Sequence, residues 1–352
     1  MTSEKKRELS VMSQVKLLPL LLLLSANVIY GQGEVTRVGT TAANFLGMEV
    51  GTKAVAMGGA FTAMADDATA TFWNPAGLTR ANGPVTHYEI IDMYAGMDHQ
   101  FAAVVVPMGN GNFIGFSVNY FSSGDMEITT IAEPEGTNSF FNAASYAISG
   151  VFSKRLTDRV SFGLTTKFIS ERIWREKAKG IAFDIGTTYR TVNDQLTIGM
   201  VLQNLGPTMS MNDGPDISLS IDDEIFPGLP DREVRFITED FDLPVSFTLG
   251  FAYTLLGSQG ALIENPSGKL VLITDISDGF DSQLRNKWGF DYTWQEFISL
   301  RGGYRINYDV ATWSTGAGII LPVSDGDFVL DYAWSSWGDL GSISMWSAEI
   351  RF

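Results

Sequence analysis

The sequence lacks cysteine altogether, contains only two histidines among its 352 residues, and has far fewer basic than acidic side chains. The absence of cysteine excludes disulfides, zinc–thiolate sites, cysteine nucleophiles and a lipoprotein anchor. With 24 basic and 40 acidic residues the net charge is −16, which argues against a nucleic-acid partner because phosphate binding needs clustered Lys and Arg. His87 and His99 accompany no G-x-S-x-G nucleophile motif, so we expect no enzymatic activity, no cofactor and no metal site.

Long hydrophobic runs are also missing, except near the N-terminus. There, basic residues between positions 5 and 16 precede an apolar run over residues 17–29. The run is shorter than the roughly 20 residues of a transmembrane helix, so residues 1–31 are predicted to be a cleaved signal peptide. No later segment approaches about 18 consecutive apolar residues, which excludes a transmembrane helix after the signal.

Apolar and polar residues alternate in many runs from residue 85 to the C-terminus. In one run, Ile114, Phe116 and Val118 alternate with Gly115 and Ser117. A period of two belongs to strands, and this pattern suits a strand with lipid on one side and a barrel lumen on the other. The predicted strands are 85–92, 99–106, 112–122, 144–154, 158–170, 179–190, 195–204, 245–255, 268–277, 284–294, 297–307, 313–321, 327–336 and 342–352.

These runs predict an all-β fold, a 14-stranded antiparallel transmembrane β-barrel over residues 85–352. An even number of strands is typical of single-chain bacterial barrels. Short connections alternate with long ones, of which 123–143 and 205–244 are the longest. We therefore expect an integral protein of the bacterial outer membrane, surrounded by lipid, with both termini periplasmic and the long loops outside.

The last run ends on an aromatic residue. Trp346, Ile350 and Phe352 share one face of the strand, while Glu349 and Arg351 lie on the other. This C-terminal strand resembles the signal by which the barrel assembly machinery recognises outer-membrane barrels for insertion. We expect the strand to close the barrel against 85–92, with Phe352 at the periplasmic lipid interface.

Residues 32–84 form a different region, rich in small and apolar residues but without either regular period. The aperiodic block 38–84, about 45 residues, is too small to form a core of its own, so residues 32–84 are predicted to be an N-terminal plug, or hatch, inside the barrel mouth. Its distinctive motif positions are Gly58, Gly59, Asp66, Asp67, Asn74, Pro75 and Ala76.

Each of these motif positions has more than one interpretation. The Gly58–Gly59 pair is compatible with a phosphate cradle, but no GxxxxGK[ST] context follows, and we expect close packing of the plug. Asp66 and Asp67 can bind a cation, although we expect them to begin a helix and to pair with barrel-interior arginines. Residues 74–76 have turn chemistry and can also gate a passage, and both interpretations stay open.

Charged residues occur at strand positions predicted to point inward. Such residues usually pair with each other and with a plug, and they can also form a selectivity lining or bind an acidic ligand head. The predicted lumen charges are Lys167, Asp184, Arg190, Arg301, Arg305 and Asp331.

The connection 205–244 carries ten acids against two arginines together with several apolar residues. It suits either a loop that docks a partner or a lid that binds divalent ions loosely. We favour docking, through Asp222, Asp223, Glu224, Ile225 and Phe226.

One segment of the predicted plug resembles a known family. The run MGGAFTAMADDATATFWNPAGL, residues 57–78, is similar to the N-terminal signature of PorV/PorQ proteins and, more distantly, of FadL-type fatty-acid channels. Both resemblances imply a 14-stranded outer-membrane barrel with an N-terminal hatch that carries an Asn-Pro-Ala motif.

The PorV/PorQ resemblance implies a role in type IX secretion, in which the extracellular loops dock the translocon or secreted cargo proteins. The alternative is a FadL-like passive transporter of a hydrophobic small molecule, and an outer-membrane hydrolase is a more remote third hypothesis. A continuous apolar pocket from the loops to Phe61, Phe72 or Trp73 would favour transport. A lumen sealed by ion pairs, with apolar loop tips projecting outward, would favour a secretion partner.

Overall fold

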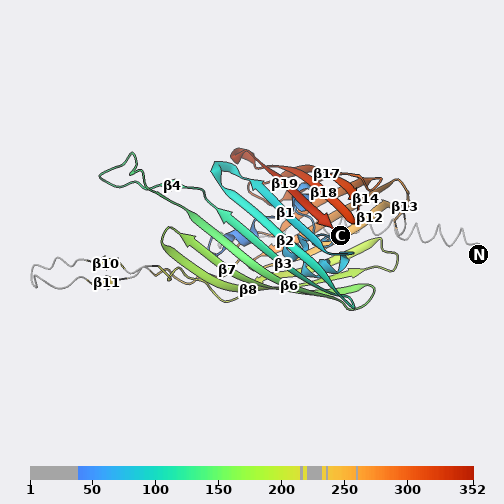
Figure 1. Ribbon diagram of the computed structural model, residues 1–352, viewed down its shortest axis with the longest axis horizontal. Helices are drawn as coiled ribbons and strands as arrows, with labels where there is room; N and C mark the ends of the chain where they lie inside the picture. Colours follow the sequence, from blue (N-terminus) through green and yellow to red (C-terminus); the bar gives the residue numbers. More distant parts are fainter. Residues whose placement is uncertain (1–38, 215–216, 220–231, 235–236, 259–260) are drawn as a thin grey trace, which may run out of the picture.

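Fourteen long strands form one closed antiparallel barrel, which confirms the predicted fold (Figure 1). The computed structural model describes residues 39–214, 217–219, 232–234, 237–258 and 261–352. The predicted signal peptide, residues 1–31, lies outside the described residues, as do the proposed docking residues Asp222, Asp223, Glu224, Ile225 and Phe226.

The barrel strands follow one another around the wall in sequence order. They are β1 (Val85–Asp92), β2 (Asp98–Gly109), β3 (Asn112–Ser122), β6 (Ala143–Arg155), β7 (Val160–Ile173), β8 (Glu176–Arg190), β9 (Leu196–Leu205), β12 (Ser246–Gly257), β14 (Gly268–Gly279), β15 (Arg285–Trp294), β16 (Ile298–Ile306), β17 (Trp313–Val323), β18 (Gly326–Ser336) and β19 (Ser342–Arg351). β9 pairs with β12 and β19 pairs with β1, so the sheet closes on itself. Every boundary lies within three residues of its predicted position.

The connections between barrel strands contain several short strands, which the alternation did not predict. β13 (Ile263–Glu264) lies beside the end of β12, and β10 (Ile217–Leu219) pairs with β11 (Arg232–Val234). In the connection before β6, β4 (Met126–Glu127) pairs with β5 (Phe140–Phe141). This second hairpin projects beyond the long-loop end of the barrel (Figure 1).

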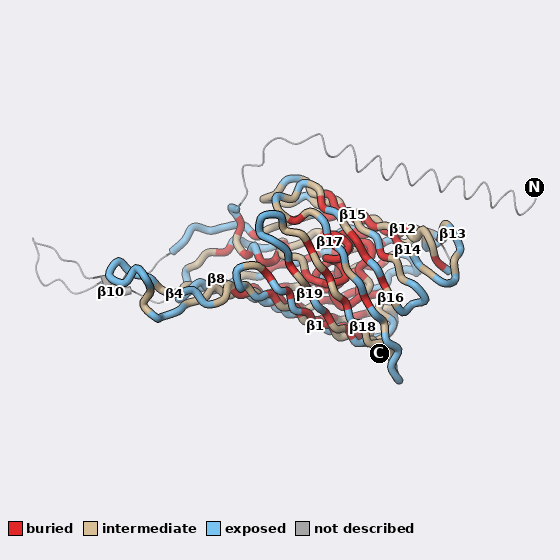
Figure 2. The backbone as a smooth tube through the Cα atoms, turned by 90° about the horizontal axis from the view of Figure 1, so that it is seen from above, coloured by how far each residue is buried: buried red, intermediate tan, exposed pale blue. Residues whose placement is uncertain are grey.

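The wall follows the period of two that the sequence shows. In β3, Phe116 and Val118 are exposed on the outside, while Ser117 and Asn119 are buried on the inside. Figure 2 shows this alternation as red and pale blue along many strands. An exposed apolar outer row has no favourable contact with water, so the exterior suits a hydrocarbon surrounding.

The C-terminal strand closes the barrel as predicted. Trp346 is 63% exposed and Phe352 is 59% exposed on the outer face, whereas Glu349 is buried inside. β19 runs antiparallel to β1, with Ile350 opposite Thr86. Phe352 therefore lies at the end of the barrel that carries the short turns, where its N–H donates to the carbonyl of Pro84 at 2.9 Å.

Residues 39–84, hereafter the N-terminal segment, lie inside the ring of strands. The segment contains two 3₁₀ turns, η2 (Asn44–Gly47) and η3 (Pro75–Arg80), and two short helices, α3 (Thr52–Ala56) and α4 (Ala70–Trp73). Two further 3₁₀ turns, η4 (Tyr94–Gly96) and η5 (Gly338–Leu340), lie in five-residue connections at the long-loop end of the barrel. No helix in the described part of the chain has the length and apolar character needed to span a membrane.

The N-terminal segment runs through the barrel from the long-loop end to the short-turn end. Near its start, the N–H of Ala42 donates to the carbonyl of Asp242 at 2.9 Å, and the N–H of Ala43 donates to Glu171 at 3.1 Å. Both partners lie at the long-loop end, opposite Phe352. The mature N-terminus, predicted to be periplasmic, lies outside the described residues, and the described part begins at the other end of the barrel.

Candidate functional site in the barrel interior

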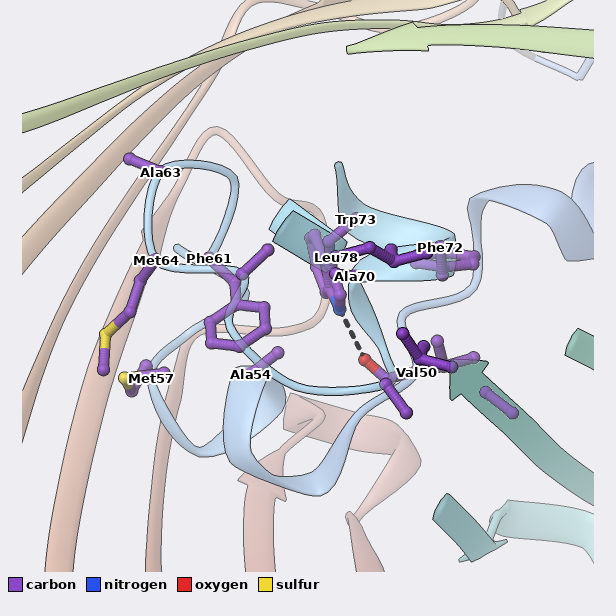
Figure 3. Packing of buried hydrophobic residues seen from close by; sticks show 14 of the residues in the cluster. Val50, Ala54, Met57, Phe61, Ala63, Met64, Ala70, Phe72, Trp73 and Leu78 are labelled. Atoms are coloured by element: carbon purple, nitrogen blue, oxygen red, sulfur yellow. Dashed lines mark hydrogen bonds between the residues drawn. The ribbon is translucent and has the colours of Figure 1, made fainter. Parts of the chain in front are cut away.

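The N-terminal segment fills the barrel with a compact apolar core. Phe61, Phe72 and Trp73 pack edge to face, with ring centroids 5.4 to 6.2 Å apart along this chain of contacts. The indole N–H of Trp73 donates to the carbonyl of Val50 at 2.8 Å, which ties together two parts of the segment (Figure 3). Small residues such as Ala54 complete the core, which explains the small-residue composition of this region.

Glycines on the inner face of the wall let the segment approach the strand backbones closely. On the side of the segment, Gly58 has a φ of +71°, and a Cβ at this position would come within 2.9 Å of the backbone nitrogen of Tyr304 on β16. Several wall glycines likewise leave no room for a Cβ beside the segment, namely Gly163, Gly186, Gly199, Gly250, Gly289 and Gly303. The path of the segment is therefore fixed by the shape of the wall. Gly59 also adopts a positive φ and lies against the side chain of Glu49.

The Asn-Pro-Ala turn anchors the segment to β6, β7 and β8. The Asn74 side chain donates to the carbonyls of Thr62 at 3.0 Å and Thr187 at 3.2 Å, and it accepts from the N–H of Ala76 at 3.2 Å. From the wall, the hydroxyl of Ser153 donates to the carbonyl of Pro75. The turn thus joins two parts of the segment to the wall, and the Asn74 side chain and the Pro75 carbonyl are both occupied by these hydrogen bonds.

Two wall carboxylates that the sequence analysis did not single out hold backbone N–H groups of the segment. Glu89 on β1 accepts from Gly51 at 2.6 Å and from Thr52 at 2.9 Å. Asp275 on β14 accepts from Phe61 and Thr62, each at 2.9 Å. Both carboxylates are fully buried. The only signal in the sequence was their inward position in the strand alternation.

The adjacent acids Asp66 and Asp67 differ in their surroundings. Asp66 pairs with Lys53 at 2.6 Å, and Asp67 accepts from the N–H and hydroxyl of Thr69 just before α4. The expected ion pairs with barrel arginines are replaced by contacts within the segment, because both side chains fold back on it. Burial and the nearby Glu349 raise the pKa of Asp67 to about 6. Burial also opposes ionisation of Asp66, but Lys53 outweighs it and lowers the Asp66 pKa.

Five of the six predicted lumen charges are buried inside the barrel and paired. Lys167 contacts Asp184 at 2.8 Å. Arg301 contacts Asp331 at 2.5 Å, and Arg305 contacts Glu49 of the segment at 2.7 Å. The Lys167 contact links the neighbouring strands β7 and β8, and the Arg301 contact reaches across β17 to β18. The Arg305 contact links the wall to the segment.

Arg190 differs from the other predicted lumen charges. It has the inward parity, but it lies at the last position of β8, and its side chain is 41% exposed. It donates to the carbonyl of Asp158 and lies 3.8 Å from Asp194, both in short turns. The prediction of a lumen charge was therefore wrong here, because strand parity gives the face of a residue and not its depth along the barrel.

Two adjacent hollows lie on the long-loop side of the segment. The inner cavity, about 350 Å³, reaches Phe72 and Trp73. The outer cavity, about 500 Å³, is lined mainly by apolar side chains, among them Phe45, Phe121, Met209 and Met211. Asn44 and Met48 line both cavities, so the stretch 44–48 separates the outer hollow from the inner one.

A third hollow, about 870 Å³, lies on the short-turn side of the segment and has a different chemistry. Its lining includes Lys53, Asp66, Asp291, Arg301 and Arg351. The segment therefore separates two hollows toward the long loops, of which only the outer one is mainly apolar, from a charged hollow toward the short turns. Within the described residues, no group of three or more His, Cys, Asp or Glu side chains is arranged to hold a metal ion.

No protein-family model matches the chain, and no curated protein matches it either. Solved structures share its fold. The Ralstonia pickettii toluene transporter TbuX aligns with a TM-score of 0.55 at 13% identity, covering 86% of this chain and 97% of TbuX. The CymD monoaromatic hydrocarbon channel aligns at 0.56 and 15% identity, covering 88% and 97%.

A Pseudomonas aeruginosa FadL homologue aligns with a TM-score of 0.51 at 13% identity, covering 86% of this chain and 98% of the homologue. The fold of the chain is thus that of FadL-like barrels, the more distant of the two resemblances that the sequence indicates. The comparisons give no support to the PorV/PorQ assignment.

Proposed function

We propose that the protein is an outer-membrane channel that lets a small hydrophobic molecule pass inward through the barrel. The observation that carries this proposal is the pair of cavities between the long loops and Phe72 and Trp73. The outer cavity is largely apolar and the inner cavity reaches these rings, which meets in part the condition set out above for transport, a continuous apolar pocket. The long loops then face outward and Phe352 faces the periplasm.

Apolar lining and enclosure are what a hydrophobic ligand needs. Ligand pockets are concave, mostly apolar and carry few polar groups, and the outer cavity matches this description. The similar structures described as a toluene transporter and a monoaromatic hydrocarbon channel support the same proposal from an independent direction.

In this proposal the N-terminal segment acts as a plug. Its packing on the wall glycines blocks a straight path to the charged cavity on the short-turn side. A ligand that reaches Trp73 must then leave sideways into the membrane or pass the plug after part of it has moved. The Asn-Pro-Ala turn is bonded to the wall, which makes it an anchor of the plug rather than its moving part.

Filling the inner cavity tests the proposal. Gly47 lines this cavity, and a Cβ there would meet no atom within 4 Å. Gly47→Phe therefore places a ring in the cavity without a clash at its root, and Gly47→Ala is the matched control. Cells that produce the protein in their outer membrane should take up labelled toluene faster than cells with an empty vector. We expect Gly47→Phe to abolish this gain and Gly47→Ala to keep it.

Uptake that equals the empty vector for the unchanged protein would refute the proposal. Unchanged uptake by a correctly folded Gly47→Phe variant would show that the ligand does not use this cavity. Folding is checked by the shift in gel mobility that heating causes in intact barrels.

The second candidate is a partner in type IX secretion, as the resemblance to PorV/PorQ implies. One observation favours it. The β4–β5 hairpin projects beyond the barrel and presents Ile131, which is fully exposed, and Phe140, which is 60% exposed (Figure 1). Affinity purification from native membranes in mild detergent would recover a translocon protein or secreted cargo. The loss of that partner in an Ile131→Asp variant, but not in Gly47→Phe, would favour docking over transport.

A further inference from the structure

One carboxylate faces the outer cavity. Glu171 lies on β7 with the same inward parity as Lys167, and among the described residues that line this cavity it is the only one that ionises at neutral pH. One of its oxygens accepts from the N–H of Ala43 at 3.1 Å, and the other accepts from the hydroxyl of Ser145 at 3.3 Å. A carboxylate has about four acceptor positions, so both oxygens of Glu171 can accept further hydrogen bonds.

No cation balances the charge of Glu171. In the part of the chain that the structure describes, this carboxylate takes part in no ion pair. The cations nearby in the sequence are engaged elsewhere, since Arg172 donates to Asn142 at 2.8 Å and Lys179 contacts Asp213 at 2.5 Å. A partly buried charge without a counter-charge is costly, so Glu171 would be stabilised by a cation that a ligand brings.

The inner cavity shows the contrasting case. There, one carboxylate oxygen of Glu49 lies 2.9 Å from Nζ of Lys287, and the other accepts from the Arg305 guanidinium at 2.7 Å. Burial opposes ionisation of Glu49, but the two cations outweigh it and lower the Glu49 pKa to about 2. The charge of Glu49 is thus satisfied within the protein, whereas that of Glu171 is not.

The rest of the outer cavity suits an aromatic body. Phe45 from the N-terminal segment, Phe121 from β3 and Phe241 from the connection after β9 all line it. Aromatic rings pack on one another and also attract ammonium groups to their faces. Met209 and Met211 add unbranched side chains that adapt to irregular shapes. The volume of about 500 Å³ lies within the range of roughly 300 to 1,000 Å³ that is typical of small-molecule pockets.

We propose that the outer cavity recognises a small arylalkyl amine, whose protonated amino group binds Glu171 while its ring packs among the phenylalanines. This inference rests on the proposed channel function and names the substrate class that the outer cavity prefers. Binding displaces no part of the plug, because Glu171 already lines the cavity and has acceptor positions left. A molecule of the same shape with a carboxylate head is repelled by Glu171.

Binding of three probes tests the inference. The probes 2-phenylethylamine, 2-phenylethanol and phenylacetate share a phenyl ring and a short chain, and their head groups are positive, neutral and negative at neutral pH. The protein is placed in phosphatidylcholine nanodiscs, and empty nanodiscs provide the blank. Salt at about 0.15 M screens exposed charges beyond about 8 Å, which limits the effect of the overall negative charge. We expect the amine to bind at least about tenfold more tightly than the alcohol, and phenylacetate to bind most weakly.

Three variants sharpen the test. Glu171→Gln keeps an acceptor for the N–H of Ala43, so it should fold, and it should lower the affinity for the amine about tenfold, to that of the alcohol. Glu171→Lys should reverse the preference in favour of phenylacetate. Glu133→Gln is the matched control, because it removes an exposed carboxylate at the same end of the barrel but outside the cavity, and it should change no affinity.

The outcomes separate this inference from the proposed function. Equal affinity for the three probes, or no binding of any of them above the blank, would overturn the role of Glu171 and leave the channel to be judged by toluene uptake. A preference for the amine that persists in folded Glu171→Gln would place the ammonium elsewhere and overturn the assignment. An equal loss in Glu133→Gln would attribute the preference to the overall charge and overturn it as well.

Discussion

Replacing Glu89 with glutamine should release the first helix of the N-terminal segment from the wall. Glu89 is fully buried and accepts from two backbone N–H groups, those of Gly51 and Thr52, at 2.6 and 2.9 Å. Glutamine has the same shape, but it keeps only one acceptor and turns an N–H₂ group toward the other donor. His87, which lies 3.5 Å from Glu89, keeps its second partner Glu349 at 3.3 Å.

The magnitude follows from the bonds that are lost. Hydrogen bonds to a charged group contribute about 1.5 to 3 kcal/mol each, and an unsatisfied buried N–H costs about as much again. Losing one charge-assisted bond and weakening the other should cost the attachment of α3 about 3 kcal/mol. The population of the released state should then rise about 100-fold, since each 1.4 kcal/mol is a factor of about ten.

The assay uses the complete absence of cysteine in the chain. A single cysteine is introduced by Ala54→Cys, at a fully buried position of α3, and its labelling by a maleimide is followed in membranes. The labelling rate reports how often α3 is exposed, and we expect Glu89→Gln to raise it about 100-fold. Asp184→Asn is the control, because Asp184 is equally buried but contacts Lys167 and the N–H of Asn204 on the wall instead of the segment.

The reasoning would be refuted if Glu89→Gln changed the labelling rate by less than about threefold relative to the Ala54→Cys protein with Glu89 intact. Such a small change would mean that the two bonds contribute less than about 1 kcal/mol to the attachment of α3. An equal rise in Asp184→Asn would attribute the effect to general loosening of the barrel instead of to the bonds at α3.

The same reporter tests three further features of the segment. Gly58→Ala forces a Cβ to within 2.9 Å of the nitrogen of Tyr304 at a φ of +71°, so labelling should rise at least about tenfold. Gly109→Ala has a similar φ of +80° but no neighbour within 4 Å, and it should leave labelling unchanged. The pKa of Asp67 is raised to about 6, so the folded segment takes up a proton more readily than the unfolded chain as the pH falls from above 6 toward 4. The folded segment becomes more stable over this range. The labelling rate of the introduced cysteine, divided by its rate in the unfolded chain at the same pH, should therefore decrease. The pKa of Glu49 is lowered to about 2, so its contribution is lost as the pH falls from about 4.5 through 2, and labelling should rise again. A steady rise in labelling as the pH falls would contradict the Asp67 assignment, and a steady decrease down to pH 2 would contradict the Glu49 assignment.

The sequence predicts the wall of this barrel well because the wall obeys a local rule. Each strand has lipid on one side, so the period of two is imposed residue by residue and can be read without knowing the neighbours. Trp346 and Phe352 were placed on the correct face for this reason. The same rule says nothing about height along the barrel, which is why the depth of Arg190 was wrong.

The interior could not be predicted in the same way, because its contacts join residues far apart in the chain. In the sequence, strand alternation shows only that Glu89, Asp275 and Lys287 are polar residues that face inward. Their partners can be identified only when the path of the N-terminal segment is known. The apolar residues of the segment follow no regular spacing in the sequence, because the wall surrounds the segment on all sides. What the sequence did show was the high content of small residues, which is the counterpart of the inward-facing glycines that the segment touches.

Contacts between the N-terminal segment and the wall are spread along the length of the segment. From residue 51 onward the backbone is bonded to the wall at several places, including the contacts of Glu89, Asp275 and Ser153. The stretch 41–49 is held at both of its ends, because the N–H of Ala43 donates to Glu171 at one end and Glu49 pairs with Lys287 and Arg305 at the other. This stretch also lines both cavities on the long-loop side. In the proposed channel, a ligand that passes from the outer cavity to the inner one would therefore have to displace residues 44–48, which lie between the bonded positions Ala43 and Glu49.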